Sequence, residues 1–163
     1  MKKVHYQDKW PENIDWKILF EKAMKIAVIA HTGQRDRYDQ PYILHPIRVM
    51  QSVEHPMEKI CAILHDVVED SDWTLKLLKK EGFPAMIIEA LDGLTKREGE
   101  EYQNYVRRAA QNPIARQIKL ADLNDNMTLQ RIDSLNPGDF KRLQKYHEAW
   151  KFLQNIDENS ETK

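Results

Sequence analysis

Proline and glycine are sparse in this sequence, and most of the prolines stand where a helix would begin. The 163 residues contain 7 Pro and 5 Gly. Proline fits the first turn of a helix because its missing N–H has no intrahelical partner there. No segment alternates apolar and polar residues over five or more positions with the β-branched enrichment of a strand. The sequence therefore predicts an all-α fold of about seven or eight helices.

Apolar residues recur every three to four positions in a series of segments, each bounded by a proline, a glycine or a capping residue. The first predicted helix has Asn13 as its N-cap and runs to about His31. Pro46 opens a later helix, which puts His45 directly before its N-terminus. The other predicted helices cover residues 56–70, 74–82, 84–94, 100–111 and 113–127, with a last one from Gly138 or Asp139 to about 154.

Length, charge and cysteine content restrict the classes of protein to which this sequence can belong. A chain of 163 residues can bury roughly 70% of its unfolded surface in one core, and residues 1–163 are predicted to form a single domain with a frayed polar tail after about residue 156. Its one cysteine cannot form an internal disulfide, which is compatible with a reducing compartment. The net charge of -1 argues against general binding to nucleic acid or to an anionic membrane. Because no signal peptide or long apolar span is found, we expect a soluble cytoplasmic protein.

Four ionisable side chains lie close together in the predicted helix over residues 56–70: His65, Asp66, Glu69 and Asp70. Residues four apart share a helix face, and unpaired charge on an otherwise apolar helix is costly to bury. A divalent cation would compensate the charge, because imidazole nitrogen with carboxylate oxygen is a typical donor set for Mn, Fe, Co, Ni or Zn. The alternative is a helix end at the surface that is merely polar.

Two further residues extend this pattern along the chain. His45 stands among apolar residues between two prolines, and Asp122 stands among apolar residues of the predicted helix over 113–127. Alone, the histidine could be a packed core residue and the aspartate could be paired with a lysine or arginine. Together with the His-Asp pair they form an ordered series of His, His-Asp and Asp.

Four motifs in this order carry a resemblance to a known family: His31-x-Gly33-Gln34, Pro41-Tyr42-Ile43-x-His45-Pro46, Leu64-His65-Asp66-Val67-Val68-Glu69-Asp70 and Lys119-Leu120-Ala121-Asp122. The sequence resembles the HD superfamily of metal-dependent phosphohydrolases, and within it the hydrolase domain of RelA/SpoT enzymes that degrade the alarmone (p)ppGpp. The resemblance covers about residues 23–129 and implies an HD-type domain.

The resemblance also implies roles for individual residues. It makes His45, His65, Asp66 and Asp122 the ligands of a divalent metal, for which Mn²⁺ is the usual ion of the family. Glu69 and Asp70 match the pair that positions and activates the attacking water. This division between metal ligands and water-activating residues agrees with the chemistry of such sites, in which carboxylates beside the ligands orient water and take its proton.

The loop after the first motif departs from the family. In the alarmone hydrolases this loop carries an adjacent Arg-Lys pair that flanks the guanine. Here Asp36 stands at the first of these positions, Arg37 keeps the second, and Arg35 is displaced by one. A carboxylate accepts hydrogen bonds where a guanidinium donates and stacks, so an acid beside the base pocket changes the preferred hydrogen-bond partner. Tyr38 could stack on a base, or simply pack.

Two more residues are assigned to substrate. Lys119, three residues before Asp122, is the basic residue best placed to meet a diphosphate. Asn126 matches an Asn that contacts the nucleotide sugar in the family, and it could equally be a polar residue near a helix end. The family's basic residue after the last ligand is Leu123 here, and its His before the Asn is Asp125.

The resemblance implies an enzyme that removes pyrophosphate from the 3′ position of a guanosine or adenosine polyphosphate, a small-molecule nucleotide. A synthetase activity is not expected from a chain of this length. The altered loop keeps a second enzyme open, a phosphatase of another nucleotide such as a 5′-nucleotide or NADPH. A third possibility is a non-catalytic sensor that binds metal and nucleotide, although a sensor has no need of the Glu69-Asp70 pair. Nothing in the sequence indicates the oligomeric state.

Overall fold

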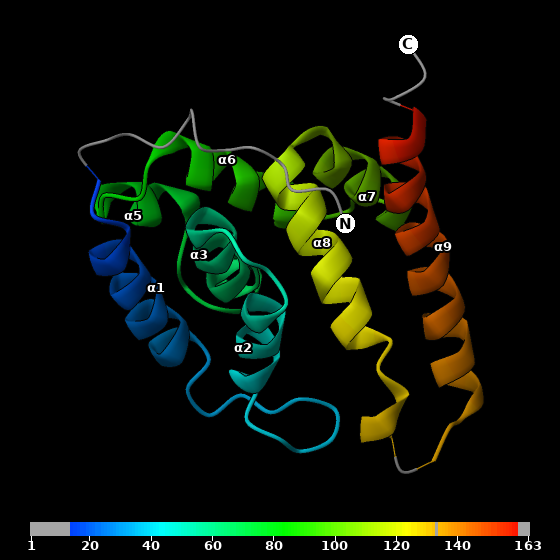
Figure 1. Ribbon diagram of the computed structural model, residues 1–163. Helices are drawn as coiled ribbons and strands as arrows, with labels where there is room; N and C mark the ends of the chain where they lie inside the picture. Colours follow the sequence, from blue (N-terminus) through cyan, green and yellow to red (C-terminus); the bar gives the residue numbers. More distant parts are fainter. Residues whose placement is uncertain (1–13, 133, 160–163) are drawn as a thin grey trace.

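The computed structural model describes residues 14–132 and 134–159, and these residues are built almost entirely of helices (Figure 1). The helices are α1 (Trp16–Ala30), α2 (Leu44–Gln51), α3 (Pro56–Leu64), α4 (Val67–Asp70), α5 (Leu75–Lys80), α6 (Ala85–Leu94), α7 (Tyr102–Gln111), α8 (Pro113–Asn126), the 3₁₀ turn η2 (Leu129–Arg131) and α9 (Pro137–Asn159). Within the described ranges, the only β pairing is a single bridge between Arg35 and Pro41. The predicted all-α class is confirmed.

The first helix begins later than predicted. Asp15 is the N-cap of α1, and its carboxylate accepts a hydrogen bond from the backbone N–H of Lys17. Asn13, which was predicted to cap this helix, lies outside the described residues. The other end agrees with prediction, since His31 is the C-cap and Gly33 follows with φ of 79°, a left-handed conformation that glycine adopts easily.

Helix α2 begins two residues earlier than predicted, at Leu44. His45 therefore lies inside the first turn rather than before it. A proline at the third helical position is tolerated because the N–H groups of the first turn have no intrahelical acceptor. The helix can thus start upstream of Pro46, and its first turn holds the His45 ring rigidly.

The predicted helix over residues 56–70 is broken into α3 and α4 at His65 and Asp66. The Nδ1 atom of His65 lies 2.7 Å from the carbonyl oxygen of Ala62 and donates a hydrogen bond to it. In an uninterrupted helix the backbone N–H of Asp66 would bind that oxygen, so the side chain competes with the helix. If α4 is counted as the continuation of α3, the described part of the chain contains eight α-helices, in agreement with the prediction.

The remaining helices begin at or next to the capping residues and prolines from which they were predicted. Thr74 caps α5 through a hydrogen bond from Leu77, Pro84 precedes α6, and Pro113 opens α8. The last helix differs at both ends: it begins at Pro137 and extends to Asn159, beyond the point where a frayed tail was predicted. Residues 160–163 of that tail lie outside the described part of the chain.

The described helices enclose two apolar clusters that share α8. The larger cluster joins α1, α2, α3, α5 and α6 to the α8 residues Ile114, Ala115, Ile118 and Ala121. The smaller joins α7 and α9 to Leu120 and Leu123 of the same helix. In Figure 1, α8 accordingly lies between α9 on one side and α2 and α3 on the other. None of the described helices is long and apolar enough to cross a membrane.

Candidate metal centre

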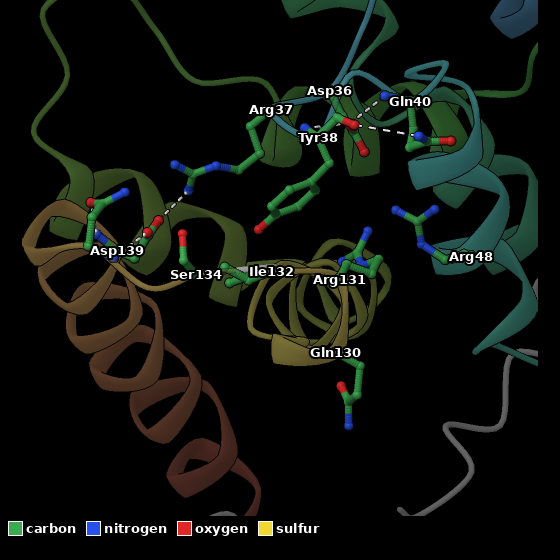
Figure 2. Close-up of a pocket in the computed structure, with 11 residues that line it drawn as sticks. Asp36, Arg37, Tyr38, Gln40, Arg48, Gln130, Arg131, Ile132, Ser134 and Asp139 are labelled. Carbon is green, nitrogen blue, oxygen red and sulfur yellow. Dashed lines mark hydrogen bonds and ion pairs between the residues drawn. The ribbon is translucent and has the colours of Figure 1, made fainter.

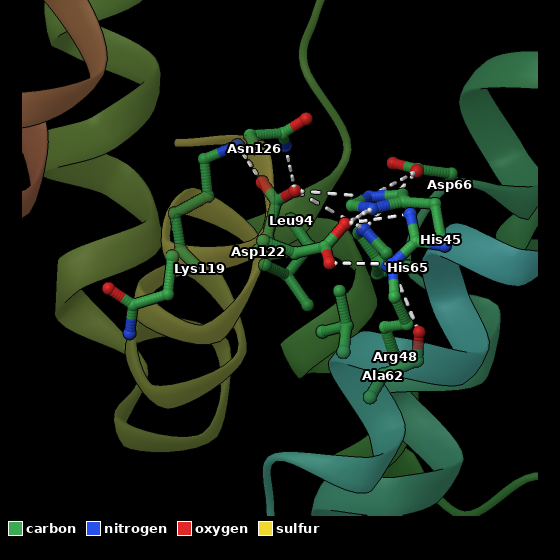
Figure 3. A network of polar contacts seen from close by, with 12 residues as sticks. His45, Arg48, Ala62, His65, Asp66, Leu94, Lys119, Asp122 and Asn126 are labelled. Atoms are coloured by element: carbon green, nitrogen blue, oxygen red, sulfur yellow. Dashed lines mark hydrogen bonds and ion pairs between the residues drawn. The ribbon is translucent and has the colours of Figure 1, made fainter. Parts of the chain in front are cut away.

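Four side chains from three parts of the fold converge where α8 faces α2 and α3 (Figure 3). His45 Nε2 lies 3.2 Å from Asp122 Oδ1 and 3.5 Å from Asp66 Oδ2. His65 Nε2 lies 3.2 Å from Asp66 Oδ2 and 3.8 Å from Asp122 Oδ1. The chain thus brings together the four residues that the resemblance assigned to a metal. Their atoms belong to the His and carboxylate types that bind first-row divalent cations.

The buried part of this cluster fits a metal ion. One donor atom each of His45, His65 and Asp122 lies within 4.8 Å of the others, and all three residues are buried. Because His65 Nδ1 donates to a carbonyl, its other nitrogen, Nε2, carries the free lone pair when the ring is neutral. This Nε2 atom is buried and forms no hydrogen bond within the described residues. These three residues could therefore hold a metal.

The acids around the two imidazoles raise the pKa of both rings. Burial lowers the pKa of His45, but the hydrogen bonds to Asp122 and Asp125 outweigh burial and raise the pKa to about 10. Burial lowers the pKa of His65 as well, and the charges of Asp66 and Asp122 outweigh it and raise the pKa. Because a metal ion binds the neutral form of imidazole, it would bind in competition with protons.

Asp122 is held by two neighbours on its own helix. Lys119 Nζ lies 2.7 Å from Asp122 Oδ2, and Asn126 Nδ2 donates to Oδ1. Burial raises the pKa of Asp122, but the Lys119 ammonium and the hydrogen bond with His45 outweigh burial and hold the pKa well below its usual range. Lys119 is itself buried, with 8% of its surface exposed, and its ammonium also lies 4.9 Å from the ring centre of Tyr105.

Asp66 is supported by a tyrosine. The hydroxyl of Tyr42 donates a hydrogen bond of 2.7 Å to Asp66 Oδ2. Burial, followed by the negative charge of Asp66, raises the pKa of Tyr42 far above its usual value, so the phenol keeps its proton. Tyr42 had been part of a motif but had no assigned role, because a tyrosine between proline and isoleucine does not reveal which acid it meets.

Glu69 and Asp70 lie on α4, beside the four converging side chains. The Glu69 carboxylate accepts a hydrogen bond from the backbone N–H of Lys96, in the loop between α6 and α7. Asp70 interacts with the hydroxyl of Tyr42, and its backbone carbonyl accepts from the Gln34 side chain. Burial raises the pKa of both carboxyls above their usual values. Both are thus better proton acceptors than a fully solvated carboxylate.

Asp125 is part of the cluster, although sequence reasoning gave it no role. Its Oδ2 atom lies 2.7 Å from His45 Nδ1, and Arg48 and Arg131 contact the same carboxylate. A signal was present, since Asp125 follows Asp122 by one helical turn on the same face. No signal marked Arg48 or Arg131 as partners of an acid.

Salt bridges neutralise two of the acids in this cluster. Asp122 is paired with Lys119, and Asp125 with Arg48 and Arg131. The contacts that the described residues make with Asp66 come from Tyr42 and the two imidazoles, without a lysine or arginine. Arg48 and Arg131 are distant in sequence from Asp125, whereas the pairing of Asp122 with a basic residue was one of the alternatives that the sequence left open.

Next to the cluster of His45, His65, Asp66 and Asp122 is a pocket of about 590 Å³ between the loop over residues 34–42, η2 and the start of α9 (Figure 2). Arg37 and Tyr38, both predicted to bind substrate, line it, together with Arg48 and Arg131. Arg37 forms an ion pair of 3.0 Å with the buried Asp139.

The other residues assigned to substrate are not among the residues lining this pocket. Arg35 lies on the same loop and contacts the backbone carbonyl of Asp39. Lys119 and Asn126 both contact the carboxylate of Asp122. Their predicted contacts with substrate stay predictions.

Asp36, which stands where a basic residue was expected, has a role within the loop. Its Oδ1 atom accepts hydrogen bonds from the backbone N–H groups of Tyr38 and Gln40, at 2.8 and 2.9 Å (Figure 2). An aspartate commonly stabilises a turn in this way. One carboxylate oxygen of Asp36 is therefore engaged in holding the loop.

Comparison with known proteins agrees with the motifs. No protein-family model matches this chain. The probable GTP pyrophosphokinase of Mycobacterium leprae is 32% identical over 127 residues, 70% of this chain and 16% of the relative. The guanosine-3′,5′-bis(diphosphate) 3′-pyrophosphohydrolases of Aquifex aeolicus and Haemophilus influenzae are 30% identical over 119 residues and 32% identical over 136 residues, which are 66% and 74% of this chain.

The chain spans only 16 to 20% of the length of these curated relatives. A solved structure of a metazoan ortholog of SpoT, described as hydrolysing ppGpp, matches with a TM-score of 0.67 at 22% identity, over 89% of this chain and 87% of that one. The two share a fold. This chain is thus related, over about two thirds of its length, to one segment of the RelA/SpoT-type pyrophosphohydrolases and pyrophosphokinases, as its motifs indicated.

Proposed function

We propose that this chain is a metal-dependent phosphohydrolase that removes pyrophosphate from the 3′ position of a guanosine or adenosine polyphosphate. One observation carries the proposal: each of His45 and His65 places Nε2 within 3.2 to 3.8 Å of carboxylate oxygens of both Asp66 and Asp122. The names of the matched relatives support ppGpp as the first substrate to test.

The four converging residues would hold the ion, and Mn²⁺ is our first choice because it is the usual ion of the family that the sequence resembles; the mixed nitrogen and oxygen donors are compatible with it. Such a cation, when bound, polarises a phosphoryl oxygen and offsets its negative charge. Lys119 and Asn126 fix the carboxylate of Asp122, and Tyr42 fixes that of Asp66. These contacts restrain the two carboxylates.

Glu69 and Asp70 would orient the attacking water and take its proton. Their raised pKa values suit proton acceptance near neutral pH better than an ordinary carboxylate does. The Lys96 N–H holds the Glu69 carboxylate in one orientation. We assign the nucleoside to the pocket beside the cluster, where Arg37 and Tyr38 offer a guanidinium and an aromatic ring.

The direct test is incubation of metal-reconstituted protein with ppGpp, ppApp, NADPH and 5′-mononucleotides, with identification of the released phosphate. We expect pyrophosphate from the 3′ position of ppGpp or ppApp in the presence of Mn²⁺, and none with chelator. Absence of release from every compound would refute the hydrolase proposal.

Glu69→Gln combined with Asp70→Asn tests the assigned proton acceptors. The double variant should lose at least 100-fold in kcat, because general-base catalysis typically contributes 10²–10⁴-fold. Its nucleotide affinity should be retained, which isothermal titration can measure. A non-catalytic sensor would bind nucleotide without turnover in the wild-type chain, and unchanged turnover in the double variant would remove the assignment of the base.

A phosphatase of another nucleotide is the second candidate, and Asp36 is the observation that favours it. The residue replaces a basic side chain of the family and contributes a loop-stabilising carboxylate instead of a guanidinium. Release of phosphate from NADPH or a 5′-nucleotide, with ppGpp and ppApp left intact, would establish this alternative.

A further inference from the structure

The two nitrogens of the His45 ring have separate partners. Nε2 faces Asp66 and Asp122, whereas Nδ1 lies 2.7 Å from Asp125 Oδ2. An ionised carboxylate only accepts hydrogen bonds, so Nδ1 is the donor in this contact. A neutral ring held this way presents the lone pair of Nε2 to the cluster, which is the form that binds a metal.

Two packed helices create this arrangement with residues one turn apart. Helix α2 carries His45 and Arg48, and α8 carries Asp122 and Asp125. Residues separated by three positions lie on one helix face, so the pair on α2 meets the pair on α8. The spacing lets His45 contact both aspartates, one through each nitrogen.

The Asp125 carboxylate is itself held from several directions. Arg48 binds both oxygens, with Nε 2.7 Å from Oδ1 and Nη2 3.1 Å from Oδ2. Arg131, on η2, places Nη2 3.1 Å from Oδ2 and also donates to the backbone carbonyl of Asp125. With 11% of its surface exposed, the side chain has little freedom to rotate away from His45.

We propose that Asp125 is a positioning residue, which fixes the ring orientation and the protonated nitrogen of His45, and that Arg48 and Arg131 hold Asp125 in place. The inference rests on the proposed function only in needing a divalent ion at the cluster. Carboxylate partners of metal-binding histidines raise the basicity of the ligand, and their loss typically reduces metal affinity 10–100-fold.

The test is a titration of the metal-free full chain with Mn²⁺, followed by electron paramagnetic resonance. Asp125→Ala should bind Mn²⁺ about 10–100-fold more weakly than the wild type. Asp125→Asn, close to the wild type in shape and still able to accept from Nδ1, should lose less. Glu81→Gln removes a carboxylate from the exposed ion pair with Lys22 and should bind Mn²⁺ like the wild type.

A second control distinguishes a loss of protein stability from a loss of His45 positioning. Asn112→Ala removes the N-cap of α8 far along the helix from Asp125, so it should lower the melting temperature without changing Mn²⁺ affinity. If Asp125→Ala does not fold, the near-isosteric Asp125→Asn decides the question. A twofold or smaller loss of affinity in Asp125→Ala would overturn the proposal, as would no loss in Asp125→Asn if the alanine variant does not fold, and so would a wild-type chain with no Mn²⁺ site.

Phosphate release on the same samples keeps this proposal distinct from the hydrolase proposal. A wild-type chain that binds one Mn²⁺ but releases no phosphate would refute the proposed function, and a weaker Asp125→Ala site would still support the role of Asp125. Active wild-type protein with equal Mn²⁺ affinity in Asp125→Ala would refute only the positioning role.

Discussion

Lys119 gives Asp122 an unusual environment for a carboxylate assigned to a metal ion. One oxygen of Asp122 meets the buried ammonium, and the other faces the two histidines. Because the carboxylate shares its charge between an ammonium and the cluster, the stability of the metal-free chain and its affinity for a cation should be linked through this lysine.

Lys119→Met should lower the free energy of unfolding of the metal-free protein by about 3–5 kcal/mol, since removal of one partner leaves a buried charge uncompensated. Added Mn²⁺ should restore part of the loss by taking over the role of the ammonium. Urea unfolding with and without Mn²⁺ measures both effects. Lys22→Met, in an exposed pair, should change stability by only about 1 kcal/mol or less. Equal stability of the two variants would contradict the expectation.

At the scale of the elements, α8 determines where the site forms. Asn112 caps this helix by accepting from the backbone N–H groups of Ile114 and Ala115, and Pro113 occupies its first position. Asp122 and Asp125 of this helix then meet side chains of α2 and of the end of α3, while its apolar residues enter both clusters. Asp122 follows the start of α8 by about two and a half turns.

Asn112→Ala should destabilise the protein by about 1 kcal/mol, the usual contribution of an N-cap side chain. Asn112→Asp keeps the acceptor and places a negative charge at the helix N-terminus, so its stability should equal or exceed that of the wild type. Chemical denaturation compares the three proteins. A loss in Asn112→Asp as large as that in Asn112→Ala would show that the cap is not the cause.

The loop between α6 and α7 is fastened by Arg108, which binds the Glu100 carboxylate and the backbone carbonyls of Asp92 and Thr95. This loop supplies the Lys96 N–H to Glu69. The hydrogen bond with Arg108 lowers the pKa of Glu100 to about 2. Since this folded value lies below the unfolded one, the stabilisation is fully present above about pH 4.5 and is lost as the pH falls towards 2.

Glu100→Gln should therefore be less stable than the wild type at pH 7, and the difference should shrink at pH 3. Urea unfolding midpoints at the two pH values provide the measurement. A difference that stays constant between pH 7 and pH 3 would mean that the Glu100 charge does not stabilise the loop.

For the whole molecule, the proposed ion would join parts that belong to both apolar clusters. His45 and His65 come from α2 and the end of α3, whereas Asp122 comes from the helix that the clusters share. A ligand bound only by the folded chain stabilises it through mass action. Binding of the ion would thus stabilise the entire fold.

Mn²⁺ at 100 times its dissociation constant should raise the free energy of unfolding by about 2.7 kcal/mol, and a chelator should reverse the gain. The readout is chemical denaturation at a fixed protein concentration. His65→Ala removes a buried ligand and should abolish the response. An identical response in His65→Ala would place the ion elsewhere on the protein.

The limits of sequence reasoning follow from the range of the interactions involved. The starts of α5, α6 and α8 were predictable because Thr74, Pro84 and Pro113 act on their own helix. The break at His65 was not, because it depends on a side chain taking the Ala62 carbonyl rather than on helix propensity.

The same distinction applies to the site. The order of His and Asp residues in the motifs predicted which four side chains the fold brings together, and their assignment as ligands stays a prediction. The salt bridge between Arg131 and Asp125 could not be predicted, because it requires η2 to fold back along the end of α8. Likewise, no local pattern states whether Lys119 turns towards a substrate or towards Asp122.

The loop over residues 34–42 is held by internal hydrogen bonds, and this affects the entropy of ligand binding. Besides the Asp36 carboxylate contacts, its backbone is joined by hydrogen bonds from Asp36 to Gln40 and from Tyr42 to Gln34. Ordering a flexible backbone costs roughly 1–2 kcal/mol of free energy per residue. In this loop the backbone is already ordered in the folded chain. A ligand entering the pocket would therefore meet Arg37 and Tyr38 on an ordered loop, and its affinity would not be reduced by the loss of loop disorder.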